Sequence, residues 1–472
     1  MVSIMPLAAF YLMVHNYDNQ IIVMDTISMV QPRYKSLVDK LAYEIRTGKL
    51  LPGMRLPTHR HLATAHKMSL ATASRVYAEL ESMGLVIGET GRGTFVRELS
   101  LPANHGIENP TATDMLDLNF NYPSLPIQAE LLRTELKRLS TSGDIESLLR
   151  YQPHSGKLHD KRVISQYLKN KEITVAPENI IITSGAQQGI AITLLSILKP
   201  GDVVAVDALS YPGFKLAALA HHLEILPIPI TSSGTDLDKL EALCKKRAIR
   251  ALYCIPTLHN PMGWVLTLKQ RQRLIILARK YHFMIIEDAT YAFLVKKAPP
   301  SIVTLAPDIT FYISGFSKNI ASGLRVGFIV APTNTISSLE RSMRVTTWNT
   351  PALMTSIVCQ WVKEGIVDKL ERLLRKDAQQ RQKIVSEIFE GLSYIHHPTS
   401  YFLWVPLPED VRADKIVASL HQLQISVATA EPYATTTNIP HAIRIALASI
   451  DIDLLYEALI KIRKIIEYQI DL

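Results

Sequence analysis

Residues 311–328 have the sequence F-Y-I-S-G-F-S-K-N-I-A-S-G-L-R-V-G-F, and this stretch decides the fold. A strand-like apolar run leads into a loop rich in Ser and Gly, with Lys318 in the loop and Arg325 seven residues later. By itself, a lysine between Ser317 and Asn319 is equally typical of an ordinary protein surface. Ligands of open α/β sheets bind where strands end, so the other strand ends decide between the two interpretations.

The turn after the run N-I-I-I-T (179–183) is suited to an anion. The run enters S-G-A-Q-Q-G at residues 184–189, and we expect an apolar helix to begin at Ile190. Backbone N–H groups at a helix start attract phosphate. Glycine is often present at such a turn only because the turn requires it, so this motif alone is weak.

Two further strand ends carry polar side chains. The stretch C-I-P-T-L-H-N-P-M-G places Asn260 in a loop after a strand, and H-F-M-I-I-E-D-A-T-Y places Glu287 and Asp288 at a strand end, with Tyr291 three residues on. A buried carboxylate needs a partner because its desolvation is costly. Next to a phosphate-type turn, a buried acid and a phenol, Lys318 is better interpreted as a lysine that forms a Schiff base with an aldehyde cofactor.

Strand-like and helical runs alternate beyond residue 115, which predicts an α/β body with a predominantly parallel sheet. Seven short, β-branched runs are the expected strands: 179–183, 203–206, 223–228, 251–255, 283–287, 310–313 and 327–330. A smaller α/β lobe is expected from about residues 115–160 and 380–472, with helices near 369–388, 413–423 and 451–468.

The composition excludes several classes of protein. With 472 residues, of which 47% are apolar and 20% charged, the chain can form roughly two to four domains with large cores, which rules out intrinsic disorder and a small disulfide scaffold. Its three cysteines lack disulfide or zinc-ligand spacing, so no metal is expected and a reducing cytoplasm fits best. The apolar stretch 5–14 is too short to span a membrane, and residues 1–32 are expected to be a poorly ordered leader.

The positive charge is concentrated near the amino terminus. Residues 33–97 contain eleven Lys or Arg and five Asp or Glu, a net charge of +6, which leaves +2 of the total +8 for the rest of the chain. A small basic unit beside a nearly neutral body indicates an anionic partner, most often nucleic acid. The alternative is a merely solvated basic surface.

The same unit has the pattern of a winged helix-turn-helix. One helix is expected over 36–47, a second after the N-cap Thr58, a third from the N-cap Ser69 to about Met83, and then two short strands at 85–87 and 94–96. In this geometry the third helix enters the major groove, while helix N-termini and the wing contact phosphates. A protein-docking module would show the same pattern.

This unit resembles the GntR family of bacterial transcription regulators. The matching stretches are G-x-L-L-P-G-M-R-L-P-T-H-R-H-L-A, S-L-A-T-A-S-R-V-Y-A-E-L-E-S-M-G-L-V and G-R-G-T-F-V, in that order. The resemblance implies that the DNA contacts are made by Arg60, Ser69, Thr72, Arg92 and Gly93. One departure is that Leu70 and Ala71 occupy positions where members often carry Arg or Asn. Fewer bidentate base contacts are then available, and Leu70 is a candidate for contact with a thymine methyl group.

Over residues 115–472 the four strand-end motifs resemble the fold-type I pyridoxal-phosphate enzymes, the aspartate aminotransferase-like group. The resemblance implies that Lys318 forms the Schiff base, that Asp288 pairs with the ring nitrogen, and that Arg444 of A-I-R-I-A-L binds an amino acid's α-carboxylate. The other implied cofactor contacts are Ala186, Gln187, Ser317 and Arg325 at the phosphate, Asn260 and Tyr291 at the 3-hydroxyl group, Tyr211 on the ring face, and Tyr151 from a partner subunit. One departure is Gly315, three residues before Lys318, where the group usually has Ser or Thr; Ser314 is one residue earlier. The departure implies that one hydrogen bond to the phosphate is lost or rearranged.

A GntR-like unit (33–97), a linker (98–114) and an aminotransferase-like body (115–472) together resemble the MocR subfamily of bacterial regulators. The resemblance implies a cytoplasmic, homodimeric transcription regulator that binds paired half-sites in double-stranded DNA. It further implies that the protein senses pyridoxal phosphate or an amino compound, without efficient turnover and without a membrane partner. The first alternative is a functional aminotransferase with an ancillary DNA-binding unit. The second is a scaffold protein that has lost the cofactor, against which the retained Lys318 and Asp288 argue.

Overall fold

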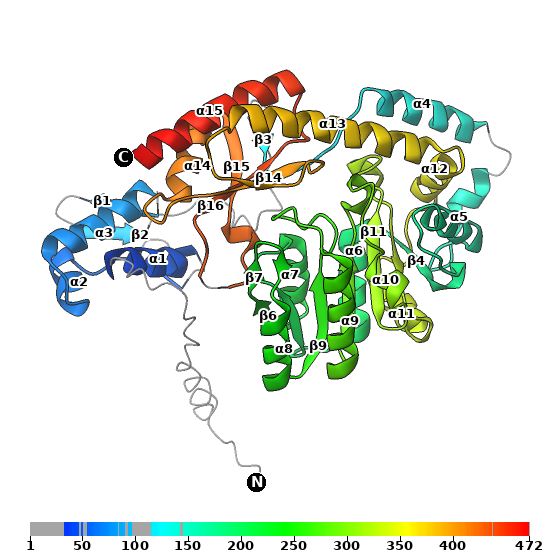
Figure 1. The fold of residues 1–472 in the computed structure, drawn as a ribbon, viewed down its shortest axis with the longest axis horizontal. Helices are drawn as coiled ribbons and strands as arrows, with labels where there is room; N and C mark the ends of the chain where they lie inside the picture. The colour runs from blue at the N-terminus through cyan, green and yellow to red at the C-terminus, as the bar shows by residue number, and fades with distance from the viewer. Residues whose placement is uncertain are drawn as a thin grey trace, which may run out of the picture. The chain divides into compact units, whose positions relative to one another are not determined.

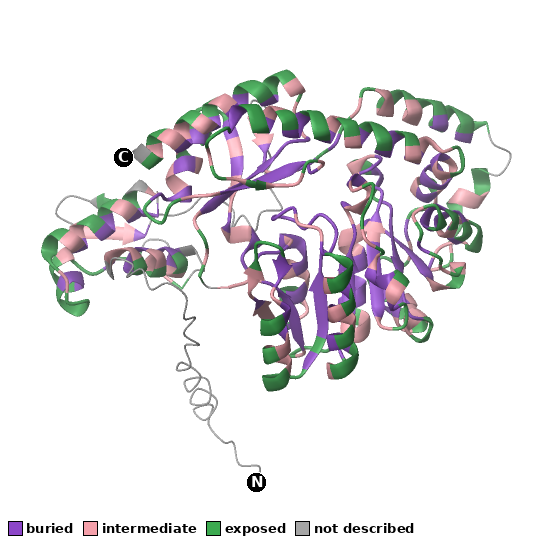
Figure 2. Ribbon diagram, viewed as in Figure 1, coloured by how far each residue is buried: buried purple, intermediate pink, exposed green. Residues whose placement is uncertain are grey.

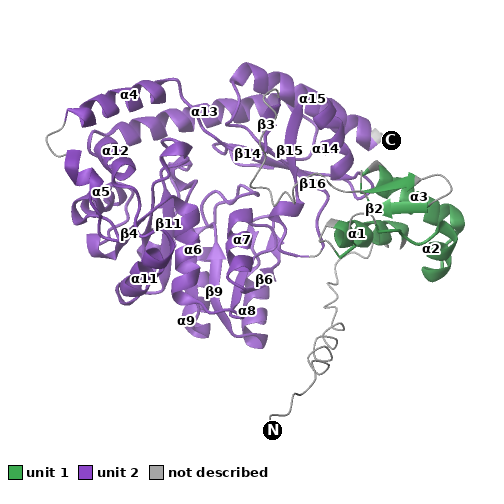
Figure 3. Ribbon diagram, turned by 180° about the vertical axis from the view of Figure 1, so that it is seen from behind, with its two compact units in different colours: residues 1–102 green, residues 103–472 purple. Residues whose placement is uncertain are grey.

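The computed structural model describes residues 33–46, 49–50, 54–83, 85–89, 93–96, 115–141, 145–436 and 438–471. The expected leader (1–32) and the expected linker (98–114) lie outside the described residues. The chain divides into two compact units, residues 1–102 and 103–472, which Figure 3 shows in different colours.

In the first unit, the described residues form three helices and a two-stranded antiparallel sheet (Figure 1). The elements are α1 (Arg33–Arg46), α2 (His59–Ala65), α3 (Leu70–Ser82), β1 (Val86–Glu89) and β2 (Gly93–Val96). Both predicted N-caps are confirmed, because the Thr58 side chain accepts from the backbone N–H of His61 and the Ser69 side chain accepts from that of Thr72.

The first unit has a hydrophobic core of its own. The predicted inner face of the third helix, Ala73, Val76, Tyr77 and Leu80, is buried. These side chains pack in one cluster with residues of α1, α2, β1 and β2. Burial of a contiguous apolar cluster is the main favourable contribution to folding, so residues 33–97 contain what an independent small domain requires.

The second unit is built on a seven-stranded sheet in the order β4-β12-β11-β10-β9-β5-β6. Strand β12 is antiparallel to β11 and β4, whereas the other neighbouring strands are parallel. All seven predicted strands are confirmed, with the bounds β4 (Ile180–Thr183), β5 (Val203–Asp207), β6 (Glu224–Ile228), β9 (Ile249–Cys254), β10 (Met284–Asp288), β11 (Thr310–Gly315) and β12 (Gly327–Val330).

Helices cover both faces of this sheet because successive strand residues point to opposite sides. In β5, Val204 and Val206 pack in one core cluster and Val203 and Ala205 in another. The face of Val204 and Val206 is covered by three helices, α6 (Ala186–Ile197), α7 (Pro212–Ala220) and α11 (Ile336–Thr346). The opposite face is covered by five helices: α5 (Leu158–Lys169), α8 (Leu237–Lys246), α9 (Leu268–Tyr281), α10 (Ile302–Leu305) and α12 (Ala352–Lys363). Six of the seven strands are accordingly buried almost throughout, whereas most of the edge strand β6 is partly exposed (Figure 2).

A five-stranded sheet forms the core of the smaller lobe. Its order is β13 (Ile395–His396), β14 (Phe402–Pro406), β16 (Ala442–Ala446), β15 (Ile425–Thr429) and β3 (Leu116–Leu118). The three predicted helices are observed as α13 (Ile366–Ile388), α14 (Ala413–Gln422) and α15 (Ile452–Asp471). Within residues 115–160, β3 pairs with β15, whereas α4 (Ile127–Ser140) contributes Leu139 to the core of the larger sheet.

Helix α13 joins the two cores. Its first turns place Val367 and Leu370 in the cluster of the larger sheet, and its last turns place Val385 and Ile388 in the cluster of the smaller sheet. The remaining described elements are short: η2 (Ile145–Leu149), η3 (Pro177–Asn179), β7 (Ile230–Thr231), β8 (Gly234–Thr235), η4 (Ala292–Leu294), η5 (Ser322–Leu324), η6 (Thr333–Thr335) and η7 (Glu431–Tyr433). Among the residues that the structure describes, no helix combines the length and the apolar character needed to cross a membrane.

Candidate functional site

A pocket lies at the carboxyl ends of the parallel strands, where the sequence motifs end. It is lined by Asn119, Phe120, Asn121, Ala186, Gln187, Tyr211, Pro212, Ile255, Asn260, Asp288, Thr290, Tyr291, Ser317, Lys318, Arg325, Tyr433 and Arg444. The structure therefore brings together every residue expected at the cofactor or carboxylate except Tyr151. Strand register explains the convergence, because β4, β5, β9, β10 and β11 end at or near one edge of the sheet.

Lys318 follows β11 and extends its amine into the pocket. Its Nζ donates to the main-chain carbonyl of Asn121 at 2.7 Å and lies 5.7 Å from the centre of the Tyr122 ring. Burial lowers the pKa of Lys318 to about 8, and the positive charges of Arg444 and Arg325 act in the same direction. A lysine with this pKa has a substantial neutral fraction near pH 8, and the neutral amine is the nucleophile.

Asp288 is buried at the end of β10 and is held by three hydrogen bonds. Tyr253 Oη donates to its Oδ2 at 2.7 Å, while the backbone N–H and the hydroxyl of Thr290 donate to its Oδ1 at 2.9 and 2.6 Å. Glu287 points to the opposite side of the sheet, where the backbone N–H of Val303 donates to it at 2.9 Å. Burial raises the pKa of Glu287. Because successive residues of a strand point to opposite faces of the sheet, Asp288 faces the pocket and Glu287 faces the protein interior.

The anion-type turn forms one end of the pocket. Helix α6 begins at Ala186, four residues before the expected start at Ile190, because Gly185 takes a positive φ of 86° and turns the chain directly into the helix. The guanidinium of Arg325 donates to Ser317 Oγ at 3.3 Å and to the carbonyl of Ser184 at 3.4 Å. The first N–H groups of α6 and Arg325 therefore present positive charge to the same place.

The departure at Gly315 has a structural basis. A Cβ atom at Gly315 would lie 3.1 Å from the Val326 carbonyl oxygen and 3.5 Å from the Ala186 nitrogen, so this position borders the start of α6. The hydroxyl of Ser314 donates to the Ala289 carbonyl at 3.3 Å. In the structure Ser314 therefore bonds away from the helix start and does not take the place of a hydroxyl at 315.

Arg444 lies in β16 and is only 3% exposed. Its Nη1 donates to the Asn119 carbonyl at 2.6 Å, and its guanidinium lies 5.0 and 5.8 Å from the ring centres of Phe402 and Tyr433. Its Nε has no hydrogen-bond partner among the described residues. Within the described part of the chain, Arg444 forms no ion pair with a carboxylate, and a buried cation without one favours an anionic ligand.

The remaining expected residues lie on the walls of the pocket. Asn260 is buried, and its Oδ1 atom has no hydrogen-bond partner. Burial raises the pKa values of both Tyr211 and Tyr291, so both phenols are neutral hydrogen-bond donors at physiological pH. Tyr211 precedes α7 and approaches Gly213 so closely that a Cβ atom there would lie 2.5 Å from its ring.

The charges of the pocket suit a ligand with two anionic groups. Lys318, Arg325 and Arg444 face a single carboxylate, that of Asp288, among the residues that line it. Arg325 lies beside the start of α6 and Arg444 lies in β16, so a phosphate and a carboxylate could be bound at separate places. This donor set fits pyridoxal phosphate together with an amino acid. Among the described residues, no group of three His, Cys, Asp or Glu could hold a metal ion.

Sequence reasoning missed seven of the lining residues: Asn119, Phe120, Asn121, Pro212, Ile255, Thr290 and Tyr433. Thr290 could have been found, since it lies within the motif that contains Asp288 and Tyr291. The segment 119–121 carried no such indication, because it contributes mainly main-chain carbonyls, which any sequence provides.

Tyr151 lies outside the pocket on an exposed apolar surface. It is 88% exposed and Leu149 is 87% exposed, and the Tyr151 ring lies 5.9 Å from that of Trp348. Val345, 79% exposed, is three residues before Trp348. Large apolar side chains that are exposed to this extent are typical of a protein interface.

The expected DNA contacts lie in the first unit. Arg60 is exposed in α2, and Ser69 caps α3 with its Oγ atom 2.8 Å from that of Thr72. Leu70 is 48% exposed, as contact with a thymine methyl group requires. Gly93 takes a φ of +122°, and a Cβ atom there would lie 2.8 Å from Arg55 Nε, which identifies Arg55 as a further basic residue beside the wing. Arg92 lies outside the described residues.

Comparison with known proteins gives the same division of the chain. The model of bacterial regulatory proteins of the gntR family matches residues 33–96, and the model of aminotransferase class I and II matches residues 113–462. A Bacillus subtilis relative named as an uncharacterized HTH-type transcriptional regulator, YdeF, is 27% identical over 420 residues, which cover 89% of this chain and 91% of the relative.

Enzymes are also similar to the body. The 2-aminoadipate transaminase of Thermus thermophilus is 26% identical over 339 residues, 70% of this chain and 84% of that enzyme. The crystal structure of an archaeal alanine:glyoxylate aminotransferase superposes with a TM-score of 0.71 at 22% identity, covering 76% of this chain and 92% of that one.

These matches confirm both halves of the resemblance found in the sequence. The body has the fold of the fold-type I aminotransferases, whose cofactor is pyridoxal phosphate, and the basic amino-terminal unit is a GntR-type helix-turn-helix domain. The chain belongs to the aminotransferase class I and II family and carries a gntR-family regulatory domain in front of the aminotransferase body.

Proposed function

We propose that this protein is a transcription regulator that binds DNA through residues 33–97 and pyridoxal phosphate through residues 115–472. The observation that carries the proposal is a single chain with both an exposed helix-turn-helix and a pocket that retains Lys318, Asp288 and Arg444. A relative that spans 89% of this chain is named as a transcriptional regulator, whereas the transaminase relative spans 70%. Residues 98–114 serve as the linker between the two parts.

Each side chain of the pocket has a role that its geometry supports. Bound pyridoxal phosphate supplies an aldehyde and an electron-withdrawing ring. Lys318 would hold the cofactor at its aldehyde, and Asp288, oriented by Tyr253 and Thr290, would pair with the ring nitrogen. Ala186, Gln187, Ser317 and Arg325 would hold the phosphate, Asn260 and Tyr291 the 3-hydroxyl group, and Tyr211 the ring face.

The effector that we infer is an amino compound with a carboxylate. Arg444 is buried, planar and without a carboxylate partner in the described chain, which favours bidentate recognition of such a group. Its amine would react where Lys318 holds the cofactor. The resulting change in the body is then converted into altered DNA binding.

We further propose a cytoplasmic homodimer. The exposed apolar side chains of Leu149, Tyr151, Val345 and Trp348 would be buried against a second copy, and Tyr151 would reach the cofactor of that copy. A ring that is 88% exposed in one chain is consistent with such a role.

A pyridoxal-phosphate-dependent aminotransferase is the second candidate, because the pocket retains the groups that such an enzyme needs. Transamination assays over a panel of amino acids would separate the two: catalytic turnover at an ordinary enzyme rate supports the enzyme, and a single slow turnover supports the regulator.

The decisive experiment is a gel shift with the full-length protein on the DNA upstream of its own gene, with and without pyridoxal phosphate. We expect specific binding that the cofactor changes. Absence of specific binding under both conditions, together with efficient transamination, would favour the enzyme.

A further inference from the structure

Residues 119–122, the first part of the connection from β3 to α4, lie at the pocket beside two of its cations, Lys318 and Arg444. The Asn121 carbonyl accepts from Lys318 Nζ at 2.7 Å, and the Asn119 carbonyl accepts from Arg444 Nη1 at 2.6 Å. Hydrogen bonds from charged donors are about twice as strong as neutral ones. The main chain of this short segment therefore determines where the two cations lie.

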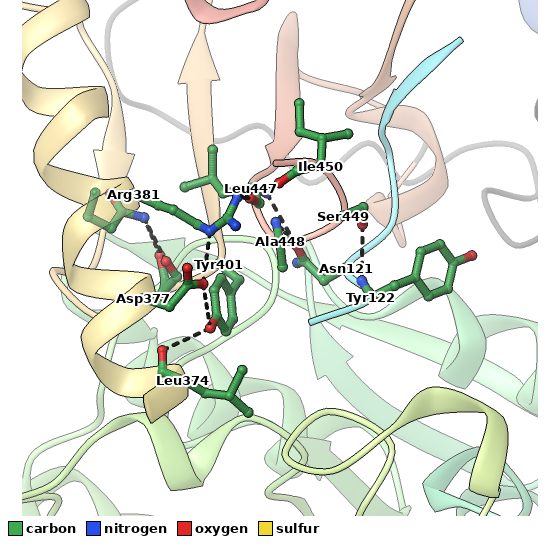
Figure 4. Close-up of polar contacts among 12 residues, drawn as sticks. Asn121, Tyr122, Leu374, Asp377, Arg381, Tyr401, Leu447, Ala448, Ser449 and Ile450 are labelled. Atoms are coloured by element: carbon green, nitrogen blue, oxygen red, sulfur yellow. Dashed lines mark hydrogen bonds and ion pairs between the residues drawn. The ribbon is translucent and has the colours of Figure 1, made fainter. Parts of the chain in front are cut away.

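The side chain of Asn121 fixes the segment in place. Asn121 is 2% exposed, and its Oδ1 accepts from the backbone N–H groups of Leu447 and Ala448, both at 3.2 Å. The backbone N–H of Tyr122 donates to Ser449 Oγ at 3.0 Å (Figure 4). The segment is thus attached to residues 447–450, the turn that follows the strand of Arg444.

Helix α13 supports this turn from behind. Arg381 donates through Nη1 to the carbonyls of Leu447 and Ile450 at 2.6 and 2.8 Å, and its Nε lies 2.8 Å from Asp377 Oδ2. Tyr401 Oη donates to the same Asp377 oxygen at 2.9 Å, as Figure 4 shows. Arg381 is 6% exposed, so its bonds to the turn are shielded from water. A continuous set of hydrogen bonds therefore runs from α13 to the Asn121 carbonyl.

We propose that Asn121 is a positioning residue for Lys318: its main-chain carbonyl holds the lysine amine, and its side chain fixes that carbonyl to the 447–450 turn. The proposal rests on the cofactor role of Lys318 given above. The carbonyl aims the amine, and the buried segment keeps water away from it, which preserves the reactive neutral form.

The contact also changes when Lys318 reacts. When the neutral Lys318 amine condenses with an aldehyde, its two hydrogens leave with the carbonyl oxygen as one water molecule, and a carbon–nitrogen double bond forms. The nitrogen then has no hydrogen to donate unless it is protonated. The Asn121 carbonyl loses a donor, and an unpaired buried acceptor is costly, so the segment must find a new partner or move.

The charged and titratable groups around Lys318 come from several elements, and a pH experiment must consider all of them. They are Tyr122 of the segment, Tyr211 before α7, Asp288 at the end of β10, Tyr291 after β10, Arg325 after η5, Tyr433 of η7 and Arg444 of β16. None of these is changed by substitution of Asn121.

The test measures the reactivity of Lys318 in the full-length protein without the cofactor. Competitive acetylation by acetic anhydride over about pH 6 to 10, followed by peptide mass spectrometry, gives the midpoint at which Lys318 becomes nucleophilic. Asn121→Ala should loosen the segment and admit water, so the midpoint should rise by about one pH unit and the labelling rate at pH 7 should fall by about tenfold.

Two further variants separate positioning from stability. Asn121→Asp keeps the Oδ1 acceptor, so hydrogen exchange of residues 119–122 should stay close to that of the unaltered protein, while the added carboxylate raises the midpoint.

Asn179→Ala is the matched control, because Asn179 also bridges two elements but lies outside the lining of the pocket. Its side chain donates to the Ala331 carbonyl at 2.9 Å and to Thr333 Oγ1 at 2.8 Å. The substitution should lower the melting temperature and leave the Lys318 midpoint unchanged.

An unchanged midpoint in Asn121→Ala would overturn the proposal, even if this variant is less stable. Addition of pyridoxal phosphate tests the proposed function separately. If the unaltered protein shows no imine absorbance, the cofactor role is wrong, while the labelling result still decides whether Asn121 positions Lys318.

Discussion

Lys318 combines the two properties that an amine needs to react with an aldehyde near neutral pH. Its pKa is lowered to about 8 by burial and by two neighbouring arginines, and its Nζ is directed by a carbonyl. At pH 7 about a tenth of such an amine is neutral, against less than a thousandth for an exposed lysine. The surroundings of Lys318 therefore increase its reactivity by about two orders of magnitude through ionisation alone.

Replacement of Lys318 by Ala should abolish the imine absorbance with pyridoxal phosphate and leave the melting temperature nearly unchanged, since the side chain is half-buried and makes one hydrogen bond. Lys215→Ala is the matched control, because burial also lowers the pKa of Lys215 and its Nζ likewise donates to main-chain carbonyls, those of Glu431 and Ala434. The control should retain the band. A band that survives Lys318→Ala would show that another amine reacts.

Asp288→Ala should slow the reaction of the bound cofactor with amino acids by about tenfold more than Tyr291→Phe does. An ion pair at the ring nitrogen controls electron withdrawal, whereas the phenol adds a hydrogen bond. Single-turnover absorbance changes after addition of an amino acid measure both. Equal effects of the two substitutions would contradict the assigned roles.

The site residues predicted from the sequence are those that act through a functional group of the side chain. Lys318, Asp288 and Arg444 lie in recognisable motifs, and the structure places all three in one pocket. Asn121 was not found, because its contact with Lys318 is made by a main-chain carbonyl and its side chain bonds residues more than 320 positions away. Such a contact depends on tertiary structure and leaves no local pattern.

At the level of elements, the sequence predicts the larger sheet better than the smaller one. The seven strands of the larger sheet are short, apolar and β-branched because both faces are covered by helices. Strands of the smaller sheet are less distinctive: β3 has three residues, and β15, I-S-V-A-T, is partly polar. The early start of α6 was missed because the positive φ of Gly185 starts the helix within the glycine-containing turn.

Ser69→Ala should destabilise the first unit by about 1 kcal/mol, because the backbone N–H of Thr72 loses its cap at the start of α3. Thr64→Ala is the control, since Thr64 Oγ1 donates only to the Arg60 carbonyl within the same helix and should have a much smaller effect. Thermal unfolding of the fragment 33–97 measures both. At a temperature where both variants are folded, a specific loss of DNA affinity for Ser69→Ala would indicate that Ser69 also contacts DNA.

In the molecule as a whole, most of the net positive charge lies in residues 33–97, whereas the pocket lies in the aminotransferase-like body. Residues 33–97 carry a net charge of +6 and their own core, so this fragment should fold alone and bind DNA weakly. Its affinity should fall at least about tenfold between roughly 50 and 200 mM salt, because phosphate neutralisation dominates. Fluorescence anisotropy with labelled duplex DNA measures this. A salt-independent affinity, or no binding at low salt, would favour a protein-docking role.

The last prediction concerns how the proposed dimer couples the two parts. If Tyr151 of one subunit contacts the cofactor of the other, cofactor binding and dimerisation must strengthen each other, because linkage is reciprocal. Two helix-turn-helix units on one dimer require two half-sites. If residues 98–114 act as a flexible tether, these seventeen residues would reach about 20 to 25 Å, and several half-site spacings could then be accommodated.

A DNA with two half-sites should therefore bind far more tightly than one with a single half-site, by about a hundredfold or more from effective concentration. The cofactor and its effector act in the body, so they should change the paired-site affinity more than the single-site affinity. Tyr151→Ala should reduce this difference, whereas Tyr468→Ala, which removes another exposed tyrosine at 60% exposure, should not. Binding curves on both DNAs, with and without pyridoxal phosphate, measure these effects. An equal response on one and two half-sites would show that the body does not act through the placement of the two DNA-binding units.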